Sequence, residues 1–270
     1  MACRNFYRNC QTVSDTIMHK TVDNDVAVPE VVGRLLFGVD STAHMNNLLQ
    51  NNITQLEWVE RNKIYPNFCG RYLNGMNSLN ADEIKFLHSK GCKIAAIYSE
   101  SCAKQSEKQG EILAKNVTDL ARDLGVPHGT AIYLEINETE SITHKFLYGF
   151  AKTLSSNNFT AGFKANTDAR YSFDREYSRG IQSNKDVFLK TLIWAVSPSL
   201  EEFNGITTTH LIHPDNWKPY APSGITRRQI AIWQYGKDCH PIEDDNENRT
   251  TFNLNLVRNE QVIIDKMFLS

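Results

Sequence analysis

The sequence lacks the features of several large classes of protein. No stretch approaches the about 18 consecutive apolar residues of a membrane-spanning helix, so we expect no membrane span. The N-terminus MACRNFYRNC lacks the apolar core of a secretory signal, and the sequence alone leaves the localisation unknown. Neither sign of charge is in excess, because 29 Lys and Arg residues stand against 31 Asp and Glu residues and neither kind forms a long block. Sequence-independent nucleic-acid binding needs a basic excess, so we expect no nucleic-acid partner.

The motifs of several common chemistries are also absent. The six cysteines form no C-x-x-C pair, and three of them lie in or beside apolar runs, as small buried hydrophobic residues do. His210-x-x-His213 has a metal-ligand spacing, but no acidic or cysteine partner is placed beside it, so we predict no metal site and no cofactor. Without a G-x-S-x-G elbow or a G-x-x-x-x-G-K-[ST] loop, a common serine hydrolase is disfavoured and P-loop chemistry is excluded.

What is present is enough apolar material for a sizeable core. The chain has 270 residues, of which 41% are hydrophobic and 10% aromatic, and this length suits one large α/β domain or two small ones. Residues 1–33 are polar and aperiodic, which predicts an N-terminal arm or lead-in. We therefore place a single folded domain at residues 34–270.

From residue 35 onward, short apolar runs alternate with segments whose apolar residues recur at helical spacing. The predicted strands cover residues 35–40, 67–73, 92–100, 130–137, 159–166, 190–199, 229–236 and 250–257. The predicted helices cover residues 46–62, 80–90, 110–127 and 143–154, with a less regular one near 180–190. Strands that alternate with helices through short loops indicate parallel β-α units.

About eight such strands favour a (β/α)8 TIM-type barrel of the α/β class, with room for irregular or missing helices in the C-terminal half. The alternative is an open doubly wound sheet of the Rossmann type. That fold needs a glycine-rich turn after its first strand to hold a pyrophosphate, whereas here Ser-Thr-Ala-His-Met follows at residues 41–45. The sequence therefore favours the barrel.

Barrel enzymes carry their active sites at the C-terminal ends of the strands. The polar and aromatic residues predicted near those ends are Asp40, Arg71, Tyr72, Tyr98, Glu100, Glu135, Asn137, Trp194, Trp233 and Gln234. Aromatic faces stack on sugar rings, carboxylates transfer protons and amides bind hydroxyl groups, so this set suits a carbohydrate site. Each residue also has a structural alternative: Asp40 can cap a turn, Arg71 can pair with Glu100, and the tryptophans can belong to the core.

Five segments carry a family resemblance: F-G-V-D (37–40), C-G-R-Y-L (69–73), I-Y-S-E (97–100), L-G-V-P-H-G-T-A-I-Y (124–133) and I-W-Q-Y (232–235). Their order and spacing resemble a family of glycoside-hydrolase-like domains, catalogued as domain of unknown function 1906 and related to family-25 lysozymes. The resemblance covers roughly residues 35–257. It implies a TIM-type barrel, a bacterial or phage-like setting, peptidoglycan or a related polysaccharide as ligand, and an extracellular or cell-wall site of action.

The sequence departs from the lysozyme relatives at two acids. Their first strand ends in an aspartate, which Asp40 matches, and their fourth strand carries an acid-x-Glu pair. Here the fourth strand reads Glu135-Ile136-Asn137, and Asn253-Leu254-Asn255 stands where an Asp-x-Asn is usual. An amide can orient an N-acetyl group, but it does not donate a proton as a carboxylic acid does.

Two functions therefore remain open. The first is a lysozyme-like glycosidase in which Glu135 is the general acid/base, and Asp40 or Glu100 supplies a second carboxylate or the substrate's acetamido group acts as nucleophile. In this hypothesis the binding subsites are shaped by Arg71, Tyr72, Tyr98, Asn137, Trp194, Trp233 and Gln234. The alternative is a non-catalytic carbohydrate-binding barrel that has lost its second acid. Glu138 and Glu140 are expected in a solvated loop beyond the site, and the oligomeric state is not predicted.

Overall fold

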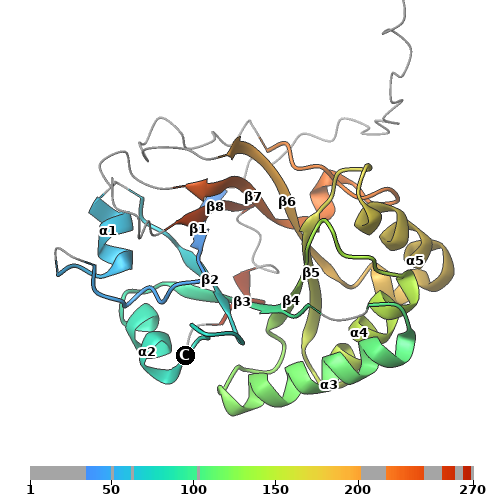
Figure 1. Cartoon of the computed structure of the whole chain (residues 1–270), viewed down its shortest axis with the longest axis horizontal. Helices are drawn as coiled ribbons and strands as arrows, with labels where there is room; N and C mark the ends of the chain where they lie inside the picture. Colours follow the sequence, from blue (N-terminus) through green and yellow to red (C-terminus); the bar gives the residue numbers. More distant parts are fainter. Residues whose placement is uncertain are drawn as a thin grey trace, which may run out of the picture. The chain divides into compact units, whose positions relative to one another are not determined.

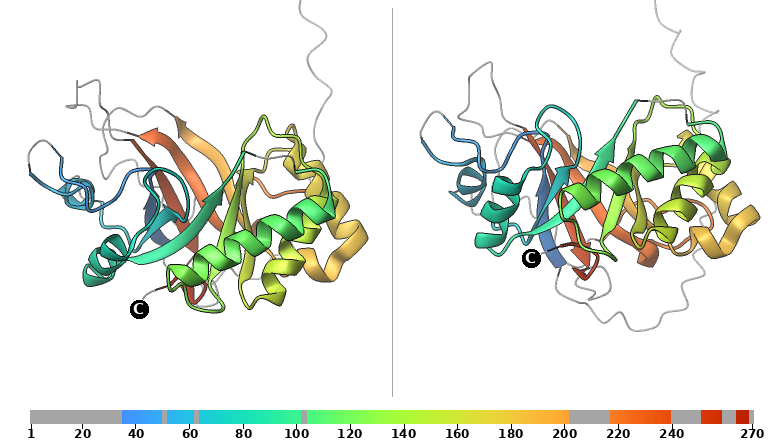
Figure 2. Two further views of the ribbon diagram at one scale, coloured as in Figure 1. Left: turned by 60° about the horizontal axis from the view of Figure 1, so that its bottom comes forward. Right: turned by 90° about the horizontal axis from the view of Figure 1, so that it is seen from below.

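A closed barrel of eight strands, joined in chain order, forms the centre of the protein (Figures 1 and 2). The computed structural model describes residues 35–49, 52–61, 64–101, 104–201, 217–239, 251–258 and 264–268. The strands are β1 (Leu35–Asp40), β2 (Phe68–Tyr72), β3 (Lys93–Ser99), β4 (Ala131–Ile136), β5 (Thr160–Asn166), β6 (Leu192–Glu201), β7 (Ile230–Cys239) and β8 (Phe252–Arg258). The predicted TIM-type barrel is confirmed. The predicted arm at residues 1–33 and the pair His210 and His213 lie outside the described residues, so the domain boundary stays a prediction.

Helices follow the first five strands along the chain, as Figure 1 shows. They are α1 (Gln55–Arg61), α2 (Ala81–Ser89), α3 (Glu107–Asp123), α4 (His144–Ser156) and α5 (Ser172–Phe188). The predicted cap of α2 is present, because Asn80 Oδ1 accepts a hydrogen bond of 2.9 Å from the Glu83 amide. Before β7 the described part of the chain has a single 3-10 turn, η3 (Arg227–Gln229), in agreement with the expected irregular C-terminal half. No helix of the described residues combines the length and apolar character needed to cross a membrane.

The first helix is shorter than the sequence predicts. The apolar spacing of residues 46–62 predicts one continuous helix, but Asn52 has a positive φ of 57° and an antiparallel bridge joins Leu48 to Thr54. A left-handed residue interrupts an α-helix, so the helix begins only at Gln55.

Strand β8 runs antiparallel to both of its neighbours, β1 and β7, whereas all other pairs are parallel. A parallel eighth strand would need a crossover, usually through a helix, to bring the chain back to the start of the sheet. The antiparallel direction brings the first residues of β8 to the C-terminal ends of the other strands. Asn253 is therefore the register partner of Asp40, the last residue of β1.

Successive residues of each strand face the barrel interior and the helices in turn. The interior cluster includes Tyr133 and Trp194, whose rings meet edge to face with centroids 5.3 Å apart. Glycine makes room for them: a Cβ on Gly70 would lie 2.6 Å from Trp194, and one on Gly162 would lie 2.4 Å from Tyr133. These rings fill the barrel below its mouth. A second cluster packs the outer face of the strands against the helices.

Candidate active site

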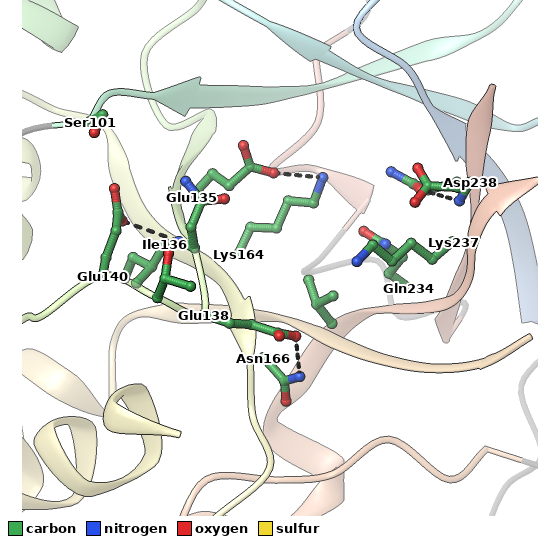
Figure 3. A pocket seen from close by; sticks show the side chains of 14 residues that line it. Ser101, Glu135, Ile136, Glu138, Glu140, Lys164, Asn166, Gln234, Lys237 and Asp238 are labelled. Atoms are coloured by element: carbon green, nitrogen blue, oxygen red, sulfur yellow. Dashed lines mark hydrogen bonds and ion pairs between the residues drawn. The ribbon is translucent and has the colours of Figure 1, made fainter. Parts of the chain in front are cut away.

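A cavity of about 430 Å³ lies beside the C-terminal ends of β4 and β5 and is closed on the other side by β7 and β8 (Figure 3). This volume falls within the about 300–1,000 Å³ of small-molecule sites. Its lining is mostly polar. The carboxylates are Glu135, Glu138, Glu140 and Asp238, the amines Lys164 and Lys237, and the amides Asn137, Asn166, Gln234 and Asn253.

Glu135 lies near the end of β4 and is held through one of its two carboxylate oxygens. Oε1 accepts a hydrogen bond of 2.8 Å from the Tyr72 hydroxyl and lies 3.2 Å from Lys164 Nζ. Lys164 is the register partner of Glu135 on β5, so the two side chains share one face of the sheet. No hydrogen bond to Oε2 is made from the described part of the chain, and the Glu135 side chain keeps 21% of its surface exposed. This oxygen is therefore available to a ligand.

The Asp40 carboxylate, unlike that of Glu135, is buried, and both of its oxygens accept hydrogen bonds. Oδ2 receives Lys164 Nζ and Asn253 Nδ2, both at 2.8 Å, and Oδ1 receives Asn255 Nδ2 at 2.7 Å. Its side chain has no exposed surface. The carboxylate is thus committed to protein donors and acts as the counterion of Lys164.

Lys164 occupies the interior of the barrel as a charged group. Burial opposes its charge, but the negative charges of Asp40 and Glu135 and the hydrogen bond to Asp40 raise the pKa of Lys164 well above its ordinary value. Its Nζ also lies 5.1 Å from the centroid of the Trp194 ring and 5.5 Å from that of Tyr72, and both aromatic faces favour a cation. Lys164 is therefore an ammonium at neutral pH.

Tyr72 completes this group as a neutral hydrogen-bond donor. Burial raises the pKa of Tyr72, so its hydroxyl keeps its proton at neutral pH and donates it to Glu135. Lys164 Nζ lies 3.3 Å from the same hydroxyl oxygen, which accepts from it. The structure thus brings three predicted site residues, Asp40, Tyr72 and Glu135, around a lysine that the sequence reasoning did not select.

Trp194 lies beneath these polar groups. It is fully buried in the interior cluster, and its indole Nε1 donates a hydrogen bond of 2.9 Å to Asn255 Oδ1. That bond orients the amide of Asn255, so that its Nδ2 points to Asp40. Because Lys164 covers it, Trp194 supports the charged group from below and offers no open face in the cavity.

Three predicted subsite residues, Arg71, Tyr98 and Trp233, face the helix layer. Arg71 is fully buried; its Nε lies 2.7 Å from Glu83 Oε1, and its guanidinium donates to the backbone oxygens of Ser41 and Asn77. Its acidic partner is therefore Glu83, and not Glu100 as the sequence alternative has it. These contacts fix the loops that follow β1 and β2.

Tyr98 and Glu100 form a separate pair at the end of β3. The Tyr98 hydroxyl donates a hydrogen bond of 2.6 Å to Glu100 Oε2, and Tyr98 packs in the outer cluster. Trp233 belongs to the same cluster and donates a hydrogen bond of 3.0 Å to the Ser197 carbonyl. Arg71, Tyr98 and Trp233 do not line the cavity. Their side chains lie outside the group formed around Lys164.

Gln234, the residue after Trp233, faces the cavity. Only 3% of its surface is exposed, and its Oε1 has no hydrogen-bond partner within the described part of the chain. A buried carbonyl oxygen without a partner costs roughly 1–3 kcal/mol of folding free energy. Gln234 thus places a buried amide with an unused acceptor in the wall of the cavity.

The loop after β4 forms one wall of the cavity. Asn137, Glu138 and Glu140 all line it, whereas the sequence reasoning placed both glutamates in solvent beyond the site. Glu140 is anchored by Lys104 Nζ at 2.8 Å and accepts a hydrogen bond of 3.1 Å from the Asn137 amide. The Glu138 carboxylate accepts from Asn166 Nδ2 at 2.6 Å. The acidic end of β4 is therefore part of the site.

Residues 64–248 match the family model of the Rv2525c-like, glycoside hydrolase-like domain, and the chain belongs to this family. The resemblance drawn from the sequence is thereby confirmed. No curated protein matches the chain.

Among solved structures, an uncharacterized B. stearothermophilus protein is 22% identical with a TM-score of 0.69, over 86% of this chain and 100% of that one. A bacterial lysozyme from Streptomyces coelicolor is 10% identical with a TM-score of 0.49, over 84% and 95%. A family GH25 lysozyme from Aspergillus fumigatus is 10% identical with a TM-score of 0.47, over 86% and 98%. At 22% identity, the similarity to the B. stearothermophilus protein shows the barrel fold alone.

Proposed function

We propose that this chain is a glycoside hydrolase that cleaves peptidoglycan or a related amino-sugar polysaccharide, with Glu135 as a catalytic carboxylate. The observation that carries the proposal is the position of Glu135 at the mouth of a glycoside hydrolase-like barrel. One of its oxygens is held by Tyr72 and Lys164, and the other is available to a ligand. Glycoside hydrolysis usually uses a pair of positioned carboxyl groups, and Glu135 can supply one of them.

The partners of Glu135 decide which catalytic role it takes. An ammonium at 3.2 Å and a phenol at 2.8 Å stabilise the carboxylate as an anion. An anionic Glu135 can accept the proton of an attacking water and stabilise the positive charge that develops on the sugar ring. The sequence predicts Glu135 as a general acid/base. The ion pair with Lys164 favours the role of general base.

Asp40 supports this role without contact to the substrate. Its carboxylate is buried and fully bonded, and it holds Lys164 in place under Glu135. Glu100 lies outside the cavity with Tyr98. In a two-carboxylate mechanism, the second acid would therefore come from the cavity wall.

The lining of the cavity suits a polysaccharide rich in hydroxyl and acetamido groups. The exposed side chain of Asn137 offers both a donor and an acceptor, and the amides of Asn166, Gln234 and Asn253 also line the cavity. Amino sugars present complementary groups on the same ring. This complementarity supports the substrate class and does not select one glycan.

The release of reducing ends from insoluble peptidoglycan tests the proposal. The wild type is compared with Glu135→Gln and with Glu111→Gln, which changes a glutamate on α3 outside the cavity. We expect release by the wild type and by Glu111→Gln, and a loss of about 100- to 10,000-fold in Glu135→Gln, the usual range for a group that transfers a proton. Equal activity of Glu135→Gln and the wild type would remove Glu135 from this role.

A second candidate function is a carbohydrate-binding barrel without hydrolysis. The observation in its favour is Asn137, an amide at the position where the resemblance to lysozymes places the second acid. In this case the wild type sediments with insoluble peptidoglycan, but soluble products and reducing ends do not increase with time.

A further inference from the structure

We propose that Glu138, which follows the amide of Asn137, is the general acid of this site; the inference rests on the proposed hydrolase function. The lysozyme-like motif has its second acid two residues after the first, where this chain has Asn137. The next carboxylate along the chain, Glu138, lines the same cavity as Glu135. The structure thus offers an acid one position beyond the expected one.

Strand β5 gives the two glutamates different partners. Lys164 and Asn166 are two residues apart on this strand, so both side chains point to the cavity side of the sheet. Lys164 Nζ lies 3.2 Å from Glu135, and Asn166 Nδ2 donates to Glu138 Oε1 at 2.6 Å. The orientation of the Asn166 amide is fixed, because its Oδ1 accepts a hydrogen bond of 3.0 Å from the Asp168 amide.

The two carboxylates have different neighbours, because the Lys164 ammonium lies beside Glu135 and the neutral Asn166 amide lies beside Glu138. Lys164 forms an ion pair with Glu135 at 3.2 Å. Glu140, the third glutamate of the wall, is also ion-paired, to Lys104 at 2.8 Å. Within the described residues, no basic side chain forms an ion pair with Glu138. Asn166 donates to its Oε1, and no hydrogen bond to Oε2 is made from the described part of the chain. Two carboxylates in contrasting environments are the usual arrangement of a base and an acid in one site.

The two glutamates are three residues apart in the chain and line the same cavity. Three residues of chain span at most about 11 Å, which limits the distance between the Cα atoms of Glu135 and Glu138. Figure 3 shows both side chains extending from the end of β4 into the same hollow, opposite Gln234 and Asp238. A single displacement by water uses a separation of about 6.5–9.5 Å between the two carboxyl groups, and the assignment requires a distance in this range.

In the bond-breaking step, Glu138 gives its proton to the glycosidic oxygen, which departs with the electron pair of the bond to the anomeric carbon. A water molecule forms the new bond to that carbon and gives one proton to the Glu135 carboxylate. The sum is the addition of one water across the glycosidic bond. Release of the proton from Glu135 to solvent and uptake of a proton by Glu138 restore the starting state.

Substrates with different leaving groups test the assignment, because a good leaving group does not need a general acid. We compare peptidoglycan with a dinitrophenyl glycoside of an N-acetylglucosamine oligomer. Glu138→Gln should lose about 100- to 10,000-fold on the polysaccharide but less than about 10-fold on the dinitrophenyl substrate. Glu135→Gln should lose activity on both. Asp238→Asn is measured in parallel, because Asp238 is another cavity carboxylate without an ion pair among the described residues.

The pH profile of Asn166→Lys provides a second measurement. An ammonium beside Glu138 would favour its ionised form, so the basic limb of kcat should move down by about 1–3 pH units. Asn166→Gln, which keeps the amide, should leave that limb in place. The inference would be overturned by full activity of Glu138→Gln on peptidoglycan, or by an unshifted basic limb of kcat in Asn166→Lys. It would also be overturned if Asp238→Asn, and not Glu138→Gln, lost activity on peptidoglycan but kept it on the dinitrophenyl substrate. Absence of hydrolysis by the wild type would instead overturn the proposed function.

Discussion

Lys164 and Glu135 are register partners on adjacent parallel strands, and the Lys164 ammonium lies 3.2 Å from Glu135 Oε1. The same nitrogen lies 2.8 Å from Asp40 Oδ2, so one cation serves two carboxylates. Only 2% of the lysine side chain is exposed, which keeps water from replacing either contact. Glu135 therefore shares its cation with Asp40, and this lysine lines the cavity although it is almost entirely buried.

Replacing Lys164 with methionine should destabilise the fold strongly. The substitution leaves the buried Asp40 carboxylate without its counterion, and breaking a buried pair in this way costs about 3–5 kcal/mol. Urea denaturation of the two proteins measures the change in unfolding free energy. Lys108→Met is the matched control, because that lysine is 71% exposed and its loss should cost less than about 0.5 kcal/mol. A cost below 1 kcal/mol for Lys164→Met would contradict the ion pair.

Replacing Tyr72 with phenylalanine should lower kcat/KM on peptidoglycan and leave the fold intact. The variant removes the hydroxyl that holds Glu135 Oε1 at 2.8 Å, and a hydrogen bond to a charged group is worth about 1.5–3 kcal/mol. If the bond is fully used in the transition state, the loss is about 10- to 150-fold. Tyr148→Phe removes a hydroxyl on α4 outside the cavity and should retain full activity. Equal kcat/KM in Tyr72→Phe and the wild type would show that Glu135 does not depend on this bond.

Much of the fold could be predicted from the sequence because each strand and helix carries a local pattern. Short apolar runs and amphipathic segments alternate from residue 35 onward, and all eight predicted strands are present. The direction of β8 could not be predicted in this way. Strand direction is decided by pairing with β1 and β7, and the pattern of residues 250–257 is the same for either direction.

The residues that line the cavity could be predicted only in part. The sequence shows which residues stand at strand ends, but the face that each one takes depends on a register of one residue. Tyr72 faces the group around Lys164, whereas its neighbour Arg71 faces Glu83. Gln234 lines the cavity, whereas its neighbour Trp233 packs in the outer cluster.

Lys164 was missed for a different reason. It is a single lysine in the apolar strand FTAGFKAN, and its partners Asp40 and Glu135 are distant in the chain. Its role follows only from contacts that the closed barrel creates. A charged residue within an otherwise buried strand was the available signal, because such a residue is seldom buried without a partner.

Replacing Arg71 with methionine should reduce stability rather than substrate affinity. Arg71 is buried, with its Nε 2.7 Å from Glu83, and removal of one partner of such a pair costs about 3–5 kcal/mol. Denaturation gives the stability, and the KM for peptidoglycan, measured well below the unfolding temperature, separates the two roles. An unchanged KM is the expected result. A several-fold rise in KM with unchanged stability would return Arg71 to the substrate-binding role that the sequence alone proposes.

The acid sensitivity of the fold should depend on Glu176, a buried carboxylate of α5. Its Oε2 accepts from the backbone amide of His144 at 3.1 Å, and Arg179 lies 2.7 Å from Oε1. Burial opposes its charge, but the hydrogen bonds from His144 and Arg175 and the charge of Arg179 lower the pKa of Glu176 below its ordinary value of 4.5. A carboxyl group with a lowered pKa stabilises the fold above its unfolded-state pKa. That contribution is lost as the pH falls through the folded-state value.

Glu176→Gln should therefore be less stable than the wild type at pH 7, by about 1–3 kcal/mol for the lost charged hydrogen bonds. The difference should narrow as the pH falls from about 5 to 3, because the wild-type carboxylate then takes up a proton. Thermal unfolding of both proteins across this range measures the effect. A gap that stays constant from pH 7 to pH 3 would show that Glu176 is not held as a stabilised anion.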